Sequence, residues 1–258
     1  MITKWRSLLS KAKQRPRLAS DNTLNFNDYV TNKRNATAIK STKSIVLTPK
    51  TLNQETYISL LTDQSKPIIF AAGPAGTGKT MLAVLAGLRA YRDGQVKKLV
   101  LTRPAVSVED EQHGFLPGDL VSKMEPWTRP IIDVVSEYYS PKEITRMIDE
   151  QIIEISPLAF MRGRNFKDSW IIADEMQNAT PSQLKMLLTR LSDGSKIVVT
   201  GDLNQTDKRA SENGLMNFME LLQQHGTANY VSGITFAGKD IQRHPAVKEV
   251  LRIYRELA

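Results

Sequence analysis

The sequence of 258 residues contains no cysteine, and its apolar runs are short. Without cysteine the chain has no disulfide bonds, no thiolate metal site and no cysteine nucleophile. No apolar run approaches the roughly 18 residues that a membrane-spanning helix requires. The basic N-terminus lacks the apolar segment and the small-residue cleavage site of a secretory signal. We therefore expect a cytoplasmic protein without integral membrane association.

Histidine and aromatic residues are also scarce. The three histidines lie far apart in the sequence, so they predict no metal cluster. Phe, Trp and Tyr make up 7% of the residues, and they do not alternate with basic residues as the side chains of a base-stacking surface do. From the residues alone, evidence for nucleic-acid binding is therefore limited to the distribution of charge.

Positive charge is concentrated at the N-terminus. Residues 1–44 contain ten Lys and Arg residues against two acidic ones, a net charge of +8, and residues 45–258 contain 25 of each sign. Within the first 13 residues, apolar side chains recur at helical spacing between basic ones, which predicts a short amphipathic helix. The sequence thus indicates a basic arm (residues 1–44) followed by a neutral body (residues 45–258).

The function of the arm stays open. It can bind nucleic-acid phosphates, lie on an anionic membrane surface, or dock its apolar stripe on a neighbouring subunit. A solvated tail is the fourth interpretation, because chain termini are often disordered.

The body alternates between short apolar strands and helical segments. Strands are predicted at residues 68–72, 99–102, 152–155, 170–173 and 197–200, and helices at 81–86, 144–148 and 181–191. Residues 106–139 are interpreted as an insertion punctuated by prolines. Strands that are apolar on both faces and alternate with helices predict an α/β fold, in which helices cover both faces of a parallel sheet.

A phosphate-binding loop directly follows the first predicted strand. Residues 73–80 match the P-loop pattern in full, as Gly73, Pro74, Ala75, Gly76, Thr77, Gly78, Lys79 and Thr80. The glycines let consecutive backbone N–H groups point at a phosphate, and the following helix presents its positive N-terminus. Lys79 would neutralise the β- and γ-phosphates, and the Thr80 hydroxyl would bind Mg²⁺. The sequence therefore predicts a site for a nucleoside triphosphate.

Two further polar segments follow predicted strands. Asp174 and Glu175 follow the strand at 170–173, where Asp174 would hold Mg²⁺ directly or through water and Glu175 could act as general base for the attacking water. Gln205 follows the strand at 197–200 and could contact both the γ-phosphate and this water, because its amide donates and accepts. The carboxyl ends of parallel strands converge on the ligand in open α/β folds, so these residues are expected to share the phosphate site.

The body resembles the PhoH family of P-loop ATPases, which are similar to the first motor domain of superfamily 1 helicases. The resemblance runs from about residue 47 to the C-terminus and rests on eight short blocks in the family's order. These are residues 53–54 (NQ), 73–80 (GPAGTGKT), 102–105 (TRPA), 114–119 (GFLPGD), 160–164 (FMRGR), 174–178 (DEMQN), 201–202 (GD) and 243–245 (RHP). The chain departs from the family at residues 109–113 and at Asn165, where Thr is usual. The resemblance implies a RecA-like P-loop NTPase fold of three layers.

The resemblance also implies roles for polar residues outside the loop. Gln54 would recognise the adenine base, because its amide offers a paired hydrogen-bond donor and acceptor. The alternative is that Gln54 is a surface glutamine without such a role. Arg162, Arg164 and Arg243 are candidates to neutralise charge on the γ-phosphate. Arg243 is preferred because it lies late in the chain. The alternative is that these arginines form structural ion pairs. Superfamily 1 helicases bind nucleotide between two motor domains, whereas this chain has sequence for one. The arginine would then come from a second copy in a head-to-tail homo-oligomeric ring, such as a hexamer.

The leading hypothesis is a Mg²⁺-dependent ATPase coupled to RNA or other single-stranded nucleic acid, with RNA helicase activity as one form of it. The alternative is a slow nucleotide-dependent switch that exchanges partners without motor activity. Intrinsic nuclease activity is not expected, because the arm offers only Asp21 and Asp28 as metal-binding carboxylates.

Overall fold

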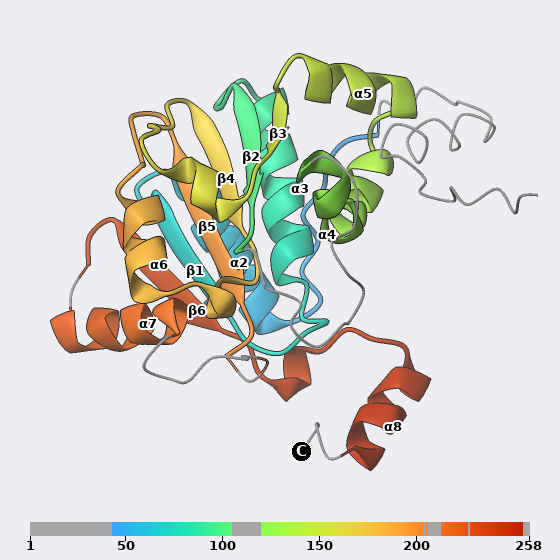
Figure 1. The fold of residues 1–258 in the computed structure, drawn as a ribbon. Coiled ribbons are helices and arrows are strands. Elements are labelled where there is room, and N and C mark those ends of the chain that lie inside the picture. The colour runs from blue at the N-terminus through green and yellow to red at the C-terminus, as the bar shows by residue number, and fades with distance from the viewer. Residues whose placement is uncertain (1–42, 105–119, 204, 206–212, 227, 255–258) are drawn as a thin grey trace, which may run out of the picture.

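The computed structural model describes residues 43–104, 120–203, 205, 213–226 and 228–254 (Figure 1). Nearly all of the predicted arm lies outside these ranges, and so does the block at residues 114–119. Within the described ranges, no helix combines the length and the apolar character that crossing a membrane demands. The arm therefore stays a prediction, whereas the body can be compared with the structure.

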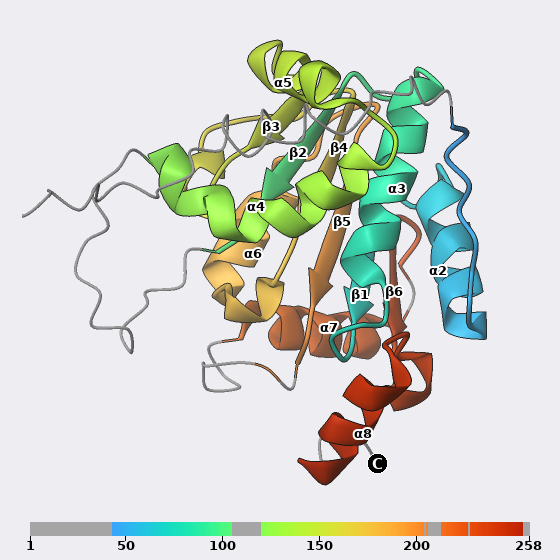
Figure 2. The same cartoon turned by 90° about the vertical axis from the view of Figure 1, so that its right-hand side faces the viewer.

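Six strands form a parallel sheet at the centre of the described body (Figures 1 and 2). Their order across the sheet is β3-β2-β4-β5-β1-β6. The strands are β1 (Ile68–Ala72), β2 (Lys98–Thr102), β3 (Ile153–Ile155), β4 (Ser169–Ala173), β5 (Lys196–Gly201) and β6 (Val231–Thr235). Each neighbouring pair runs parallel. This arrangement confirms the predicted α/β fold class.

Helices cover both faces of the sheet, which gives three layers (Figure 1). The α-helices are α2 (Leu52–Thr62), α3 (Lys79–Arg92), α4 (Leu120–Ser136), α5 (Pro141–Asp149), α6 (Pro181–Leu188), α7 (Gly214–His225) and α8 (Pro245–Ile253). Short 3₁₀ turns are η2 (Leu158–Met161), η3 (Met176–Asn178) and η5 (Gly238–Asp240). Helices α2 to α5 supply side chains to the core on one face, and η2, η3, α6 and α7 supply those on the other.

Alternating side chains of each strand enter the two cores. On β1, Ile69 and Ala71 pack on the α3 side, and Phe70 packs on the α6 side. Successive strand residues point to opposite faces, so a strand buried on both faces must be apolar throughout. The uninterrupted apolar runs that predicted these strands are therefore a direct consequence of the two-sided burial.

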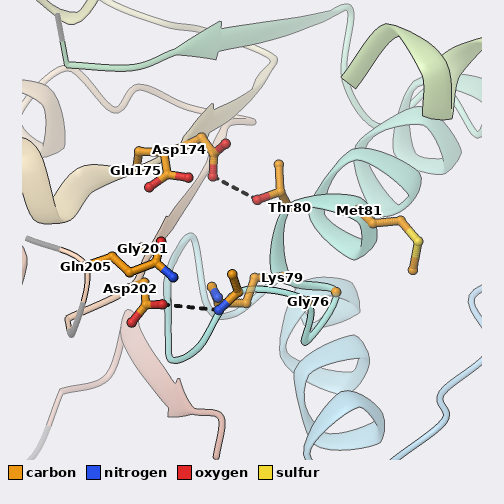
Figure 3. A pocket seen from close by; sticks show the side chains of 11 residues that line it. Gly76, Lys79, Thr80, Met81, Asp174, Glu175, Gly201, Asp202 and Gln205 are labelled. Carbon is orange, nitrogen blue, oxygen red and sulfur yellow. Dashed lines mark hydrogen bonds between the residues drawn. The ribbon is translucent and has the colours of Figure 1, made fainter. Parts of the chain in front are cut away.

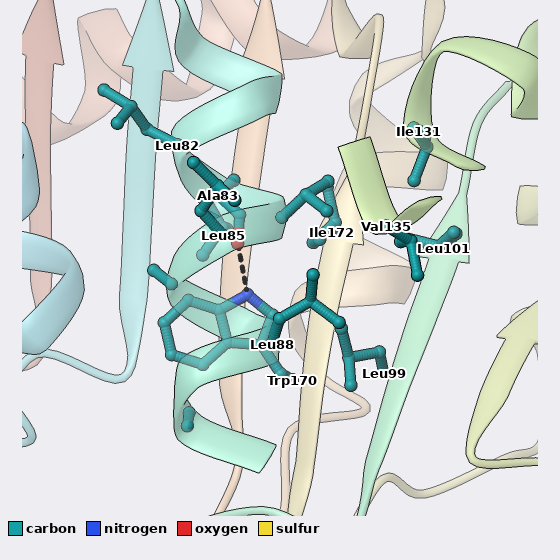
Figure 4. Packing of buried hydrophobic residues seen from close by; sticks show 14 of the residues in the cluster. Leu82, Ala83, Leu85, Leu88, Leu99, Leu101, Ile131, Val135, Trp170 and Ile172 are labelled. Atoms are coloured by element: carbon teal, nitrogen blue, oxygen red, sulfur yellow. Dashed lines mark hydrogen bonds between the residues drawn. The ribbon is translucent and has the colours of Figure 1, made fainter. Parts of the chain in front are cut away.

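The indole of Trp170 fastens β4 to α3 (Figure 4). Its Nε1 donates a hydrogen bond of 3.1 Å to the Ala83 carbonyl oxygen. Gly87 makes room for the ring, because a Cβ on this glycine would lie 2.6 Å from Trp170 Cδ1. The helix that follows the phosphate loop is thereby held close to the sheet.

Two segments depart from the sequence interpretation. Residues 120–136 lie within the predicted insertion but form α4, whose Ile131, Ile132 and Val135 are buried against the α3 side of the core. Burial of this apolar face stabilises the helix despite its prolines. The edge strand β6 had no counterpart among the predicted strands, because Ser232 and Gly233 interrupt its apolar pattern and much of the strand is partly exposed.

Candidate functional site

The phosphate loop joins β1 to α3 through left-handed glycines. Gly76 and Gly78 have φ angles of 82° and 85°, which residues with a Cβ adopt only at a cost. Gly73 is required for another reason as well, because a Cβ there would lie 2.5 Å from the Phe236 carbonyl oxygen. Its N–H donates to the Gly201 carbonyl at the end of β5. The loop is therefore enclosed by β5 on one side and by the chain after β6 on the other.

Lys79 folds back into its own loop. Its Nζ donates to the carbonyl oxygens of Gly73 and Pro74 at 2.6 and 2.8 Å and lies 3.4 Å from Thr77 Oγ1. Burial lowers the pKa of the Lys79 ammonium, while the carboxylates of Asp202, Asp174 and Glu175 act to raise it. The ammonium group is thus held against the backbone carbonyl oxygens of its own loop.

The two predicted magnesium ligands lie side by side. Thr80 Oγ1 donates a hydrogen bond of 2.8 Å to Asp174 Oδ1, which also accepts a hydrogen bond from Thr200 Oγ1 (Figure 3). A hydroxyl and a carboxylate are the hard oxygen donors that Mg²⁺ prefers, and Mg²⁺ retains several waters, so one carboxylate suffices. In the described residues no group of three or more His, Asp or Glu gathers as a metal site. The pair fits a magnesium ion that also binds phosphate oxygens.

Glu175 follows Asp174 in a strained backbone conformation. Its φ of 53° lies in the left-handed region, which residues other than glycine rarely occupy. The carboxylate accepts a hydrogen bond from the side-chain amide of Gln177. Strain of this kind is maintained where the surrounding structure fixes it, and it is common at functional sites. The turn holds the Glu175 carboxylate in the same pocket as Asp174 (Figure 3).

Gln177 and Asp202 are site residues to which the sequence analysis gave no role. The buried side chain of Gln177 accepts a hydrogen bond of 3.1 Å from the Asp202 N–H through Oε1, while its amide nitrogen donates to Glu175. Asp202 Oδ2 in turn accepts from the N–H of Ala75 at 3.1 Å. Gly201 permits this packing, because a Cβ there would lie 2.7 Å from Gln177 Oε1. A chain of hydrogen bonds therefore joins the candidate base to the phosphate loop.

The described residues enclose a cavity of about 250 Å³ at the carboxyl ends of β1, β4 and β5 (Figure 3). It is lined by Ala75, Gly76, Gly78, Lys79, Thr80, Met81, Asp174, Glu175, Gly201, Asp202 and Gln205. The loop, the acidic pair and Gln205, predicted separately from three strand ends, thus meet at one edge of the sheet. Met81 adds an exposed thioether at this edge.

The body also matches known proteins along most of its length. The sequence profile of the family described as PhoH-like protein matches residues 46–255. The chain belongs to the PhoH-like family. A PhoH-like protein of Bacillus subtilis is 41% identical over 216 residues, and one of Synechocystis is 40% identical over 219 residues. Protein PhoH of Escherichia coli is 35% identical over 194 residues.

These PhoH-like relatives are longer than the matched region. The Bacillus and Synechocystis matches each cover 83% of this chain, and they cover 66% and 64% of the two relatives. The Escherichia coli match covers 74% of this chain and 54% of the relative. The chain therefore spans less than two thirds of the length of these relatives, and the family assignment concerns the shared body.

Gln54 occupies a different environment from the one that the PhoH resemblance implies. Its side chain is buried, Nε2 donates a hydrogen bond of 2.9 Å to the Thr77 carbonyl oxygen, and Oε1 accepts one of 2.7 Å from the Lys50 N–H. Both ends of the amide are thus bonded to backbone. In this geometry Gln54 ties α2 to the phosphate loop, and its contact with adenine stays a prediction.

The three candidate arginines have three different surroundings. Arg164 forms a two-pronged ion pair with Glu154, donating from Nη1 and Nη2 to the two carboxylate oxygens. Arg243 crosses the phosphate loop of its own chain, where a Cβ on Gly76 would lie 2.5 Å from Arg243 Nε. Arg162 is exposed and forms no hydrogen bond or ion pair with any described residue. Arg243 therefore lies against the phosphate loop of its own chain, and its contact with phosphate stays a prediction.

Proposed function

We propose that this PhoH-like chain binds ATP with Mg²⁺ and hydrolyses it. The observation that carries the proposal is the meeting of the phosphate loop, the Thr80–Asp174 pair and Glu175 around one cavity. The N–H groups of residues 75–80 and the Lys79 ammonium would bind the phosphates. Thr80 and Asp174 would hold Mg²⁺, which supplies positive charge to the phosphate oxygens when it is bound.

Glu175 and Gln205 would act on the attacking water. The water oxygen forms a bond to the γ-phosphorus, the bond to the bridging oxygen of ADP breaks, and the proton of the water passes to the Glu175 carboxylate. Gln205, which lines the same cavity, would hold the water and a γ-phosphate oxygen through the two ends of its amide. Gln177 would keep Glu175 oriented, since it is already bonded to it.

Nucleotide binding would exchange internal contacts of the loop for contacts with phosphate. Lys79 would leave the carbonyl oxygens of Gly73 and Pro74, and the Ala75 N–H would leave Asp202. Because Asp202 is bonded to Gln177, this exchange would also alter the support of Glu175. Gln54 is linked to the loop by its hydrogen bond to the Thr77 carbonyl oxygen. It would contact adenine if the base lies beside α2.

We further propose that turnover is coupled to RNA or other single-stranded nucleic acid in an assembly of several copies. The support is the charge of +8 in residues 1–44 together with membership of the PhoH-like family. The cavity itself contains no element that reads a base sequence among its described residues, so recognition of nucleic acid would depend mainly on backbone phosphates.

ATP turnover with and without single-stranded RNA and DNA tests the proposal. Wild-type turnover that RNA stimulates and that Lys79→Ala and Glu175→Gln abolish is the expected result. Deletion of residues 1–42 is then expected to remove the stimulation and to leave basal turnover unchanged. Tight ATP binding with negligible turnover under all conditions would refute hydrolysis and favour the nucleotide switch.

A further inference from the structure

The side chain of Gln54 holds one peptide unit of the phosphate loop. Its Nε2 donates a hydrogen bond of 2.9 Å to the Thr77 carbonyl oxygen. A trans peptide unit is planar, so the C=O of one residue and the N–H of the next point in opposite directions. The Gly78 N–H is therefore directed away from Gln54, and Gly78 is one of the residues that line the cavity. This N–H is among the donors that would bind phosphate.

Tyr57, one turn further along α2, holds a second peptide unit in the same way. Its hydroxyl donates to the Lys79 carbonyl oxygen at 3.3 Å, so the Thr80 N–H is directed to the opposite side. The N–H of Gln242, after β6, donates to the Gly76 carbonyl oxygen at 2.8 Å and fixes a third unit. Three carbonyl groups of the loop are thus bonded to neighbouring elements, which sets the direction of the N–H groups that follow them.

The other end of the Gln54 amide is also bonded to backbone. Oε1 accepts a hydrogen bond of 2.7 Å from the Lys50 N–H. The amide keeps a second N–H and a second lone pair, but Gln54 is 2% exposed and does not line the cavity, so an adenine edge cannot reach both. To recognise adenine, the side chain would have to leave the Thr77 carbonyl and the Lys50 N–H. The loop would then lose its support from α2.

The described walls of the cavity offer no substitute for this amide. Their hydrogen-bonding side chains are those of Lys79, Thr80, Asp174, Glu175, Asp202 and Gln205. The proposed function uses all of these except Asp202 for phosphate, metal or water, and Asp202 accepts from the Ala75 N–H. Met81 is 42% exposed, and its side chain extends from α3 away from the acidic pair (Figure 3). A thioether packs against the face of any base without recognising its hydrogen-bond pattern.

We infer that Gln54 positions the phosphate loop and does not select the base, so that the site takes GTP as well as ATP. Selection would then depend on the triphosphate and Mg²⁺, which all nucleoside triphosphates share. The inference rests on the nucleotide binding proposed above, and it does not require hydrolysis.

Calorimetric titration of the wild type with AMP-PNP and with GMP-PNP, both in Mg²⁺, tests base selection. A two-pronged amide contact with adenine separates the right base from a wrong one by about 5–150-fold. We therefore expect the two Kd values to differ by less than about fivefold. A larger preference for the adenine analogue would overturn the inference.

Gln54→Leu separates positioning of the loop from recognition of the base. Leucine fills a similar volume but cannot donate to the Thr77 carbonyl, so fewer molecules hold a loop that is ready for phosphate. Both analogues are expected to bind about 10-fold more weakly, with the ratio of their Kd values unchanged. Gln64→Leu is the matched control, because Gln64 follows α2, is exposed and does not line this cavity. It should leave both Kd values as they are.

Tyr57→Phe tests the same reasoning at a residue that no base can reach. Tyr57 is fully buried and packs edge-on against Phe236, and phenylalanine keeps this packing while it removes the hydroxyl donor. Both analogues are expected to bind about 2–10-fold more weakly, again by the same factor. Thermal melts of both variants show whether the fold persists at the temperature of the titration. Unchanged affinity in a folded Tyr57→Phe variant would contradict positioning from α2.

The outcomes separate the inference from the proposed function. If neither analogue binds to the wild type, the nucleotide site itself is refuted and the inference falls with it. If both bind but neither ATP nor GTP is hydrolysed, hydrolysis is refuted, and the Kd values still decide the inference. If Gln54→Leu weakens AMP-PNP alone, Gln54 recognises adenine and the inference is wrong. Unchanged binding of both analogues to Gln54→Leu also overturns it.

Discussion

Replacing Gln177 by leucine tests the hydrogen-bond chain between the candidate base and the phosphate loop. Leucine fills a similar volume but neither donates to Glu175 nor accepts from the Asp202 N–H. The buried Asp202 N–H loses this partner, which costs about 1–3 kcal/mol of stability. For a chain of this size, that loss lowers Tm by about 2–10 °C.

We also expect Gln177→Leu to slow ATP turnover. A general base contributes about 10²–10⁴-fold to a rate, and the variant disturbs the base without removing it. We therefore expect kcat for ATP to fall by about 10–100-fold, or about 1.4–2.7 kcal/mol in activation free energy. KM is expected to stay close to the wild-type value, because Gln177 does not line the cavity that would hold the nucleotide.

A phosphate-release assay at saturating ATP, below the melting temperature of each variant, measures this effect. Gln183→Leu is the matched control, because Gln183 accepts a hydrogen bond from the Thr180 N–H in the capping box of α6 and does not line the cavity formed by the described residues. It is expected to lose about 1 kcal/mol of stability and no turnover. Equal turnover of Gln177→Leu and wild type would refute the role of Gln177 as a positioning residue.

Three further predictions concern stability, packing and the metal. Lys196 is buried and donates to three backbone carbonyls around the end of α2, and burial lowers its pKa to about 8. The unfolded chain therefore binds this proton more tightly, and the free energy of unfolding should rise by about 2 kcal/mol from pH 8 to pH 10. In urea titrations Lys196→Met should abolish this rise and the exposed-lysine variant Lys97→Met should keep it. Gly87→Ala should destabilise the fold by about 1–3 kcal/mol in thermal melts, because its Cβ would clash with the Trp170 indole, and an unchanged Tm would contradict this packing. EDTA should stop ATP turnover without changing the circular dichroism spectrum, and excess Mg²⁺ should restore it; turnover that persists in EDTA would exclude the magnesium site.

The parts of the fold that are buried on both sides could be predicted from the sequence. Residues 68–72 and 170–173 are apolar throughout because both faces of β1 and β4 are covered. The phosphate loop at 73–80 is recognisable in the sequence from its glycines and Lys79. The edge strand β6 gave a weaker pattern, since one of its sides has no neighbouring strand and Gly233 interrupts it.

The site was predictable for residues whose chemistry is tied to a local motif. Thr80 ends the phosphate-loop motif, Asp174 and Glu175 directly follow β4, and the three line one cavity, as the topology predicts. The role of Gln177 depends on Gly201 and Asp202, which approach it only after the sheet forms, so spacing along the chain could not reveal it. The environments of Arg162 and Gln54 likewise depend on tertiary contacts.

The inward position of Lys79 means that a ligand must displace internal hydrogen bonds of the phosphate loop in order to bind. A small anion such as orthophosphate would have to displace the bonds of this ammonium to Gly73 and Pro74, together with the Ala75–Asp202 bond, while offering few new contacts in return. A closed loop of this kind lowers the apparent affinity of every ligand by the fraction of molecules that are open. A nucleoside triphosphate, with three phosphates and a base, would offset this loss through its many contacts. The loop would thus discriminate against free phosphate without any residue devoted to rejecting it.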